Sequence, residues 1–405
     1  MKLTLKTLPL AISVAILPIQ AIADDQTNNK IAQLEQQVQS LQASQTASLT
    51  ERITFNGFMT GAFITSDNNA GYAGATTSAN FDDGSKFGLQ GTFAISDQTK
   101  AVMQLMMKGE NNWDVEAEWA YVSHTFENGL QARAGKLRLP LFMYSDYLDV
   151  GYAQIFVRPP EDVYGPVPFT SYTGADVSYD IEFDDSTLTF QAYGGKSDAF
   201  GVDLKNILGI NATWTDETWT LRGLYGEGSL DGTMTRQSTT SAGIDPSTGL
   251  PIYLEVTVPL LVLDEEKGQF SAIGGSYDNG SFLAIAEWTR IDVEGVFRNT
   301  DSGYLTLGYR IETFTPYVTA SFYETTDDDL RQIVDQTSAV YAAIFNGERK
   351  SYSAGLRWDA IDNLAVKFDV TYSTDFGDTS GGLKSNVAQE FDDTTVYTVQ
   401  FDVVF

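Results

Sequence analysis

The chain has 405 residues, carries a formal net charge of −29 at pH 7, and contains one histidine and no cysteine. Disulfides, thiolate catalysis and cysteine metal sites are therefore excluded, and a serine–histidine–aspartate triad or a multi-histidine metal site would depend on His124 alone. Strong negative charge makes DNA and RNA poor partners, and no cofactor or metal is expected.

Residues 1–23 have the pattern of an export signal. Two lysines precede an apolar stretch from Leu8 to Ile22, which Pro18 interrupts, and a small-residue triplet ends at Ala23. This pattern predicts a signal peptide cleaved after Ala23. A membrane anchor helix is the alternative, but about 20 apolar residues are needed to span a bilayer. No later stretch is long and apolar enough for such a helix, so a membrane location would require a closed barrel.

Residues 24–50 are predicted to form a short periplasmic coiled-coil segment. Apolar residues occupy the a and d positions of two heptads, which is the spacing of a coiled coil. These residues are Ile31, Leu34, Val38 and Leu41. Isolated helices this short are marginal in water, so an oligomer held together elsewhere would have to support them. A polar tether with accidental spacing is the alternative.

Residues 51–405 show a period of two instead of seven. In the stretch 86–95, for example, Phe87, Leu89 and Phe93 alternate with polar side chains, which predicts strands with one apolar and one polar face. We predict sixteen strands in this region. Their ranges are 52–66, 84–96, 99–108, 115–126, 130–138, 173–183, 187–194, 206–215, 218–227, 268–276, 281–291, 302–312, 315–324, 349–358, 364–374 and 394–405.

The connections between these strands alternate in length. Longer segments follow odd-numbered strands, and they include 67–83, 139–172, 228–267, 325–348 and 375–393. Tight turns follow even-numbered strands, and they include 97–98, 127–129, 184–186, 216–217 and 277–280. Outer-membrane barrels have short periplasmic turns and long outer loops, whereas a soluble β-sandwich has no reason to separate loop lengths in this way. We therefore predict an all-β fold, a transmembrane antiparallel up-and-down β-barrel of about sixteen strands with a short N-terminal coiled-coil helix.

The last predicted strand carries a resemblance to a protein class. Alternate residues from Tyr397 to Phe405 are apolar and share one face, and Phe405 ends the chain. This segment resembles the C-terminal strand of bacterial outer-membrane proteins, whose terminal phenylalanine the barrel-insertion machinery reads. The resemblance implies export to the outer membrane of a Gram-negative bacterium. An ordinary edge strand is the alternative.

The stretch 139–172 is predicted to fold into the lumen and narrow it. It is too aromatic to lie comfortably in water, and loops of this length inside a compact domain are usually functional. An extracellular flap or a subunit contact is the alternative. The charged residues predicted to line the constriction are Asp146, Asp149, Arg158, Glu161 and Asp162.

Two segments of this region carry a family resemblance. Gly135-Lys-Leu-Arg-Leu-Pro-Leu-Phe-Met-Tyr-Ser-Asp-Tyr147 and Val157-Arg-Pro-Pro-Glu-Asp-Val-Tyr164 look like those of a subgroup of Gram-negative porin-like proteins. The coiled coil before the barrel is similar to that of dicarboxylate-type porins, and the overall plan is similar to that of trimeric phosphate-selective porins. The resemblance implies a homotrimer and passive uptake, and it does not fix the solute.

Strand parity predicts a basic wall opposite this loop. If the apolar faces contact lipid, neighbouring strands turn bases inward, and a bulge at Gly135 would bring the last two of them inward while Leu137 faces lipid. The predicted inward bases are Lys86, Lys100, Lys108, Arg133, Lys136 and Arg138. Facing the loop carboxylates, they would set a transverse field that favours small anions such as organic acids. Alternatively, they only neutralise lumen carboxylates such as Glu116 and Glu118.

These features together predict a porin for small hydrophilic solutes, not an enzyme. An enzyme built on a barrel scaffold is one alternative, because Glu116 and Glu118 could serve as acid and base, and a structural surface protein is another. His124 shares the parity of these glutamates and is predicted to be a polar wall residue.

Acidic runs at 264–266, 327–329 and 392–393 make the outer mouth acidic, and they either bind divalent ions shared with lipopolysaccharide or are only solvated.

Overall fold

The computed structural model describes residues 52–405 except 200, 245–250, 296, 328–344 and 387–388. The signal peptide and coiled coil predicted for residues 1–50 lie outside the described residues, as do two of the acidic residues at 327–329. Within the described ranges, no helix has the length and apolar character needed to cross a membrane.

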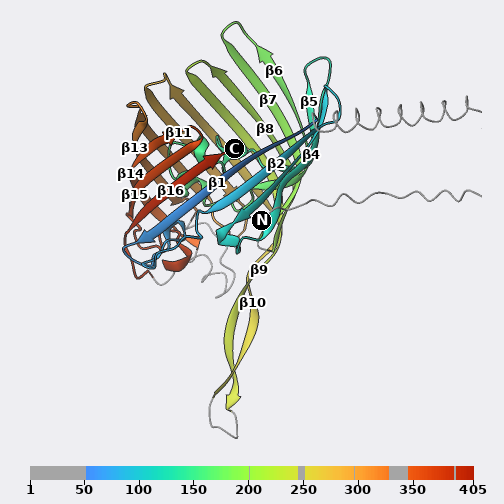
Figure 1. Ribbon diagram of the computed structural model, residues 1–405. Coiled ribbons are helices and arrows are strands. Elements are labelled where there is room, and N and C mark those ends of the chain that lie inside the picture. The colour runs from blue at the N-terminus through green and yellow to red at the C-terminus, as the bar shows by residue number, and fades with distance from the viewer. Residues whose placement is uncertain (1–51, 200, 245–250, 296, 328–344, 387–388) are drawn as a thin grey trace, which may run out of the picture. The chain divides into compact units, whose positions relative to one another are not determined.

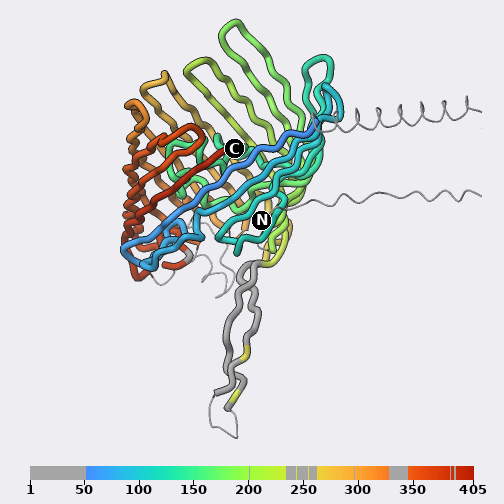
Figure 2. Tube along the Cα trace, in the orientation of Figure 1, coloured from blue at the N-terminus to red at the C-terminus, as the bar shows by residue number. Residues whose placement is uncertain are grey.

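In the part of the chain that the structure describes, sixteen antiparallel strands close into a barrel (Figure 1). The strands are β1 (Ile53–Ser66), β2 (Lys86–Ala94), β3 (Thr99–Lys108), β4 (Val115–Thr125), β5 (Gln131–Arg138), β6 (Ser171–Glu182), β7 (Ser186–Ala199), β8 (Val202–Asp216), β9 (Trp219–Ile244), β10 (Pro251–Asp278), β11 (Phe282–Val293), β12 (Thr300–Tyr309), β13 (Phe314–Thr325), β14 (Glu348–Ile361), β15 (Leu364–Thr374) and β16 (Thr394–Val404). The helical turns are η1 (Tyr72–Gly74), η2 (Gly109–Asn111), η3 (Ser145–Tyr147), η4 (Gly151–Ala153), α2 (Glu161–Tyr164) and η5 (Lys384–Asn386). Each strand pairs with its neighbours in sequence, and β1 pairs with β16, so the two ends of the described chain run side by side (Figure 2).

The barrel wall is polar inside and apolar outside. On β13 the inward side chains run from Thr315 to Thr325 in alternate positions and are buried, whereas Val318 and Phe322 on the other face are 55% and 36% exposed. The predicted apolar face of β16 lies on the outside, where Tyr397 and Phe401 are 46% and 49% exposed. This is the reverse of a soluble barrel, and it is the arrangement that a bilayer requires.

The predicted loop over 228–267 is wrong. β9 and β10 run through most of that stretch and extend beyond the other strands as a long hairpin (Figure 1). Their pairing shifts register near Pro259 and again between Leu263 and Glu266. Such bulges absorb residues that a regular ladder cannot pair, including a proline without an N–H group, so the breaker residues do not end the strands.

The predicted bulge at Gly135 is also wrong. β5 pairs without interruption through Gly135 on both sides, and the register shift lies in β4, where Glu118 is skipped against β3. Leu137 therefore faces the interior and is fully buried opposite Tyr172, so it does not face lipid as predicted. Lys136 alternates with Leu137 and therefore lies on the outer face, so it is not a pore-lining residue, whereas Arg138 ends the strand and is buried against Glu118.

The Glu118 bulge also changes the face of His124. Ser123 pairs with Arg133 on the inner face, so its neighbours Val122 and His124 lie on the outer face, and Val122 is 47% exposed. The predicted lumen position of His124 is therefore wrong. His124 instead contacts Thr99 at 2.8 Å and packs against Phe126 beside the β4–β5 turn.

Candidate functional site: the loop across the lumen

The segment between β5 and β6, residues 139–170, lies inside the barrel, as predicted, and is called the lumen loop below. Its apolar side chains pack against inward residues of β7 to β13 in one cluster. Leu139, Leu141, Phe142, Phe156 and Val163 are each at most 6% exposed. The apolar character that seemed unsuited to water is satisfied here because the facing wall is itself apolar.

The wall that receives the loop departs from the polar pattern of the other strands. Its inward positions carry aliphatic and aromatic side chains, and they are buried. They include Ile207, Leu224, Phe270, Leu283, Ile285 and Tyr304. The lumen therefore has an apolar sector, covered by the loop, and a polar sector along the remaining strands.

Asp149 anchors the middle of the loop to the polar sector. Its carboxylate lies 3.1 Å from Lys86 Nζ and 3.4 Å from Lys108 Nζ, and it accepts a hydrogen bond from Arg138. Burial alone would raise the pKa of Asp149, but Lys86, Arg138 and Lys108 together outweigh it and hold the pKa well below its usual range. Arg138 also donates to Glu118, so three bases and two acids form one network.

Asp162 anchors the far end of the loop to the opposite wall. It lies on the short helix α2, is fully buried, and pairs with Arg349 of β14. Ser321 Oγ donates to the other carboxylate oxygen at 2.6 Å. Arg349 is further held by the carbonyl of Gly381 at 2.6 Å and stacks on the ring of Tyr323.

Backbone carbonyls of the loop are held by two further bases. Arg357 Nη1 donates to the carbonyls of Tyr152 and Gln154, both at 2.7 Å. Lys367 Nζ donates to the carbonyls of Gly151 and Phe156 at 2.7 and 3.0 Å. These two bases hold the loop through its backbone carbonyls alone, so no side chain of the loop is needed as their partner.

The two consecutive exposed residues of the lumen loop lie on η3. Asp146 and Tyr147 on η3 are exposed, Tyr147 by 40%, and no ion pair of Asp146 occurs among the described residues. Asp146 lies within electrostatic reach of Arg133 and Tyr121 on the inner wall. The region between η3 and the inner wall that carries Arg133 is called the passage below.

The wall facing η3 carries a row of hydrogen-bonded polar side chains, which we call the polar ladder. Arg133 Nη2 lies 2.5 Å from Asp176 Oδ2, and Gln191 Nε2 donates to the same oxygen at 2.8 Å. Asn211 Nδ2 then donates to Gln191 Oε1 at 2.7 Å. The ladder crosses β5, β6, β7 and β8 at one level.

The remaining predicted residues are placed apart from this passage. Lys100 lies on the inner face of β3, but eight residues from Lys108, or about 26 Å along a strand. Arg158 donates to Thr398 Oγ1 at 2.5 Å and lines, with Glu161, a recess of about 20 Å³. Burial raises the pKa of Glu161.

Glu116 and Glu118 do not form the paired carboxylates that an enzyme reading would need. Glu118 is buried and is held by Arg138 and by Thr170 Oγ1 at 3.2 Å, whereas Glu116 is exposed. Because the bulge separates them, they do not share a regular strand face. In the described part of the chain, no cluster of three or more acidic, histidine or cysteine side chains is arranged to hold a metal.

Sequence reasoning missed the partners of the loop on the later strands. Arg349, Arg357 and Lys367 each occupy an inward position by parity, which is a signal that a strand-by-strand reading could have used. Gln191 and Asn211 occupy inward positions too, but single polar residues among glycines and apolar residues give no sign that they form one ladder.

Comparisons with known proteins identify the fold. No protein-family model matches the sequence, and neither does any curated protein. The chain resembles OmpF of Salmonella typhi in complex with daunomycin, with a TM-score of 0.54 and 12% identity over 86% of this chain and 97% of that one. It also resembles the trimer form of in-vitro folded OmpT, an outer membrane protein of Vibrio cholerae, with a TM-score of 0.53 and 12% identity over 87% and 99%.

An anion-selective porin from Comamonas acidovorans has a similar fold, with a TM-score of 0.52 and 13% identity over 87% of this chain and 99% of that chain. At these identities the likeness is one of fold. It places the chain among sixteen-stranded outer-membrane barrels in architecture, and the solute and its selectivity have to be argued from this chain's own residues.

Proposed function

We propose that this protein is an outer-membrane porin through which small hydrophilic solutes diffuse passively. The observation that carries the proposal is a closed barrel with an apolar outer face, crossed by a loop that leaves Asp146 and Tyr147 exposed opposite the polar ladder. A barrel of this size has a lumen wide enough for water, and a loop inside it sets size and charge at the narrowest point.

The charges at the passage favour weak selectivity over a preference for anions. Lys86, Lys108, Arg133 and Arg138, which were candidates for an anion-attracting wall, each lie against a carboxylate. A paired base contributes little field at a distance, so the neutralising role is the better supported of the two sequence readings. Asp146 then gives the passage a slight preference for cations.

We further propose the outer membrane of a Gram-negative bacterium as the location and a homotrimer as the assembly. The apolar outer wall supports a lipid environment, and a lipopolysaccharide leaflet would surround the end with long loops. The trimer is supported by the likeness in fold to an OmpT form described as a trimer and by the family resemblance of the lumen loop. Cleavage after Ala23 and the coiled coil at residues 24–50 belong to the same proposal.

The experiment is to reconstitute the purified protein in a planar bilayer and record current in a salt gradient. The proposal expects discrete current steps in groups of three and a small reversal potential of the cation-selective sign. A folded protein that passes no current would overturn the porin, and the enzyme and surface-structure alternatives would then stand first.

A further inference from the structure

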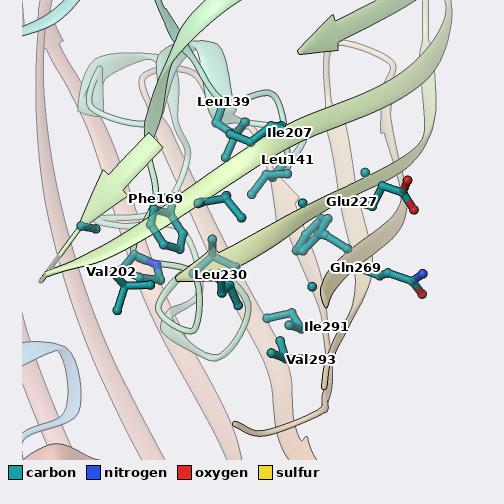
Figure 3. A pocket seen from close by; sticks show the side chains of 18 of the residues that line it. Leu139, Leu141, Phe169, Val202, Ile207, Glu227, Leu230, Gln269, Ile291 and Val293 are labelled. Carbon is teal, nitrogen blue, oxygen red and sulfur yellow. The ribbon is translucent and has the colours of Figure 1, made fainter. Parts of the chain in front are cut away.

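The lumen contains an apolar cavity that passive diffusion of hydrophilic solutes does not require. It lies at the long-loop end of the barrel, between the lumen loop and the inner faces of β7 to β11, and has a volume of about 150 Å³ (Figure 3). Leu139 and Phe169 of the loop face Val202, Leu230 and Val293 of the wall across it. Phe270 and Leu263 complete the lining from β10.

The polar residues at its edge do not enter it. Glu227 and Gln269 point away from the cavity (Figure 3), because they pair across β9 and β10 on the outer face, where Lys267 Nζ lies 3.4 Å from Glu227. A volume of about 150 Å³ with an apolar lining accommodates a molecule such as benzene. Charged and strongly hydrated ligands are therefore excluded by the lining.

Glycine residues make the space. Gly228 and Gly268 face each other across β9 and β10 on the inner face, next to Phe270 and Leu230. A Cβ atom at Gly268 would lie 3.4 Å from Leu230 Cδ1, which is ordinary contact, so a side chain at this position could grow into the cavity. The missing side chain at Gly268 therefore contributes to the hollow, whereas an added Cβ at Gly228 would lie 2.8 Å from Leu204 Cδ1.

One hydroxyl of the lining has no partner. Tyr193 is 4% exposed, and its hydroxyl makes no hydrogen bond to any residue that the structure describes. That oxygen lies over Gly209 and Gly226, 2.3 and 2.9 Å from the positions of added Cβ atoms, and Gly226 is another lining residue. A buried tyrosine hydroxyl usually has a partner, so a ligand in this cavity would gain by carrying one hydrogen-bonding group.

We propose that the cavity binds a neutral molecule with a single aromatic ring and one hydroxyl or carbonyl group, in the manner of a phenol. The ring fills the space between the lumen loop and the wall, and the polar group pairs with Tyr193. This site goes beyond the porin function, and it can be tested whether or not the protein conducts.

The experiment soaks crystals of the full protein with 4-bromophenol and locates the bromine by anomalous scattering. The expected result is a peak in the cavity that is lost in Gly268→Leu and retained in Gly223→Leu. Gly223 is the matched control because it lies on β9, and an added Cβ there meets nothing within 4 Å. A wild-type crystal without this peak, or a Gly268→Leu crystal that keeps it, would overturn the proposal.

A second measurement does not depend on a cavity-filling variant. Calorimetric titration of the protein in lipid nanodiscs, with empty nanodiscs as the blank, compares 4-bromophenol with bromobenzene. Tyr193→Phe should weaken 4-bromophenol by between about two- and tenfold, because one net hydrogen bond is lost, and should leave bromobenzene unchanged. An equal effect on both ligands, or on neither, would contradict the role given to Tyr193.

Discussion

Arg349 of β14 donates to Asp162 of the lumen loop, although the two residues are 187 positions apart in the chain. Both are buried, and neither has another residue of opposite charge in contact within the described chain. The pair therefore fixes the far end of the loop to the wall, and its loss should free that end.

Arg349→Ala is expected to destabilise the barrel by about 3–5 kcal/mol, because it leaves the carboxylate of Asp162 buried without a counter-charge. The same change should make single-channel current noisier, since α2 is no longer held. Thermal unfolding in detergent and bilayer recordings measure the two effects.

The control for this variant is Arg290→Ala. Arg290 pairs with Asp301 at 2.5 Å, but its side chain is 45% exposed, so its removal should cost at most about 1 kcal/mol. Equal costs for the two variants would show that the Arg349 pair is not the buried anchor described here.

The Asp149 anchor should resist acid. Its pKa in the folded protein lies well below the usual 3.8, so its stabilising effect is fully present above the pKa of an unfolded aspartate and is lost as the pH falls through the much lower folded value. The difference in thermal stability between the wild type and Asp149→Asn should therefore stay constant from pH 7 to about pH 5, where an ordinary aspartate is still ionised. Asp149→Asn should already be less stable to thermal unfolding than the wild type at pH 7. A stability difference that already disappears above pH 5 would contradict the tight pairing of Asp149 with Lys86 and Arg138.

Asp146 should set the sign of ion selectivity. A unit charge about 8 Å from a permeating ion changes the energy of that ion by about 0.5 kcal/mol in water. Asp146→Lys changes the charge by two units, or about 1 kcal/mol, so it should shift the permeability of potassium and of chloride by roughly fivefold in opposite directions. The reversal potential in a potassium chloride gradient measures this at low salt, where screening is weak. Asp184→Lys, in the exposed β6–β7 turn, is the control and should leave the potential unchanged. An unchanged potential in Asp146→Lys would place the passage elsewhere.

Gly135 is required by a close approach of β5 to β4. Its φ is +139°, and an added Cβ would lie 2.3 Å from the carbonyl oxygen of Ala120 and 2.8 Å from Tyr121 Cα. Gly135→Ala should therefore reduce stability by about 1–3 kcal/mol, the usual cost of such backbone strain. Gly223→Ala, which meets nothing within 4 Å, is the control. Refolding yield into detergent and thermal unfolding are the measurements, and matching values for the two variants would contradict the strained contact.

The strands were predictable from sequence because apolar and polar side chains alternate along a barrel strand, whose wall has only an outer and an inner face. The predicted range 364–374 coincides with β15, and the apolar face of β16 was assigned correctly from Tyr397 to Phe405. The entry of the lumen loop was predictable as well, because aromatic side chains of that density need an apolar partner. Parity failed for His124 because a bulge intervenes at Glu118, and it failed for Lys136 because the bulge predicted at Gly135 is not there.

The partners of the loop were not predictable in the same way. The alternation along each strand predicts that Arg349 and Lys367 point inward. It does not predict that Asp162 and Gly151 lie opposite them, because their positions depend on how a segment of about thirty residues crosses the lumen. The hairpin of β9 and β10 was missed for another reason. Glycine and proline predict loops locally, whereas a register shift lets two paired strands accommodate both.

The most direct test of the account asks whether solutes pass between η3 and the polar ladder. The chain has no cysteine, so a single introduced thiol is unique. Tyr147→Cys should lose current when a bulky, charged, water-soluble thiol reagent is added to the bilayer chamber. Phe190→Cys, on the outer face of β7 and 47% exposed, should keep its current. Full labelling of Tyr147→Cys with no change in current would contradict the position of the passage.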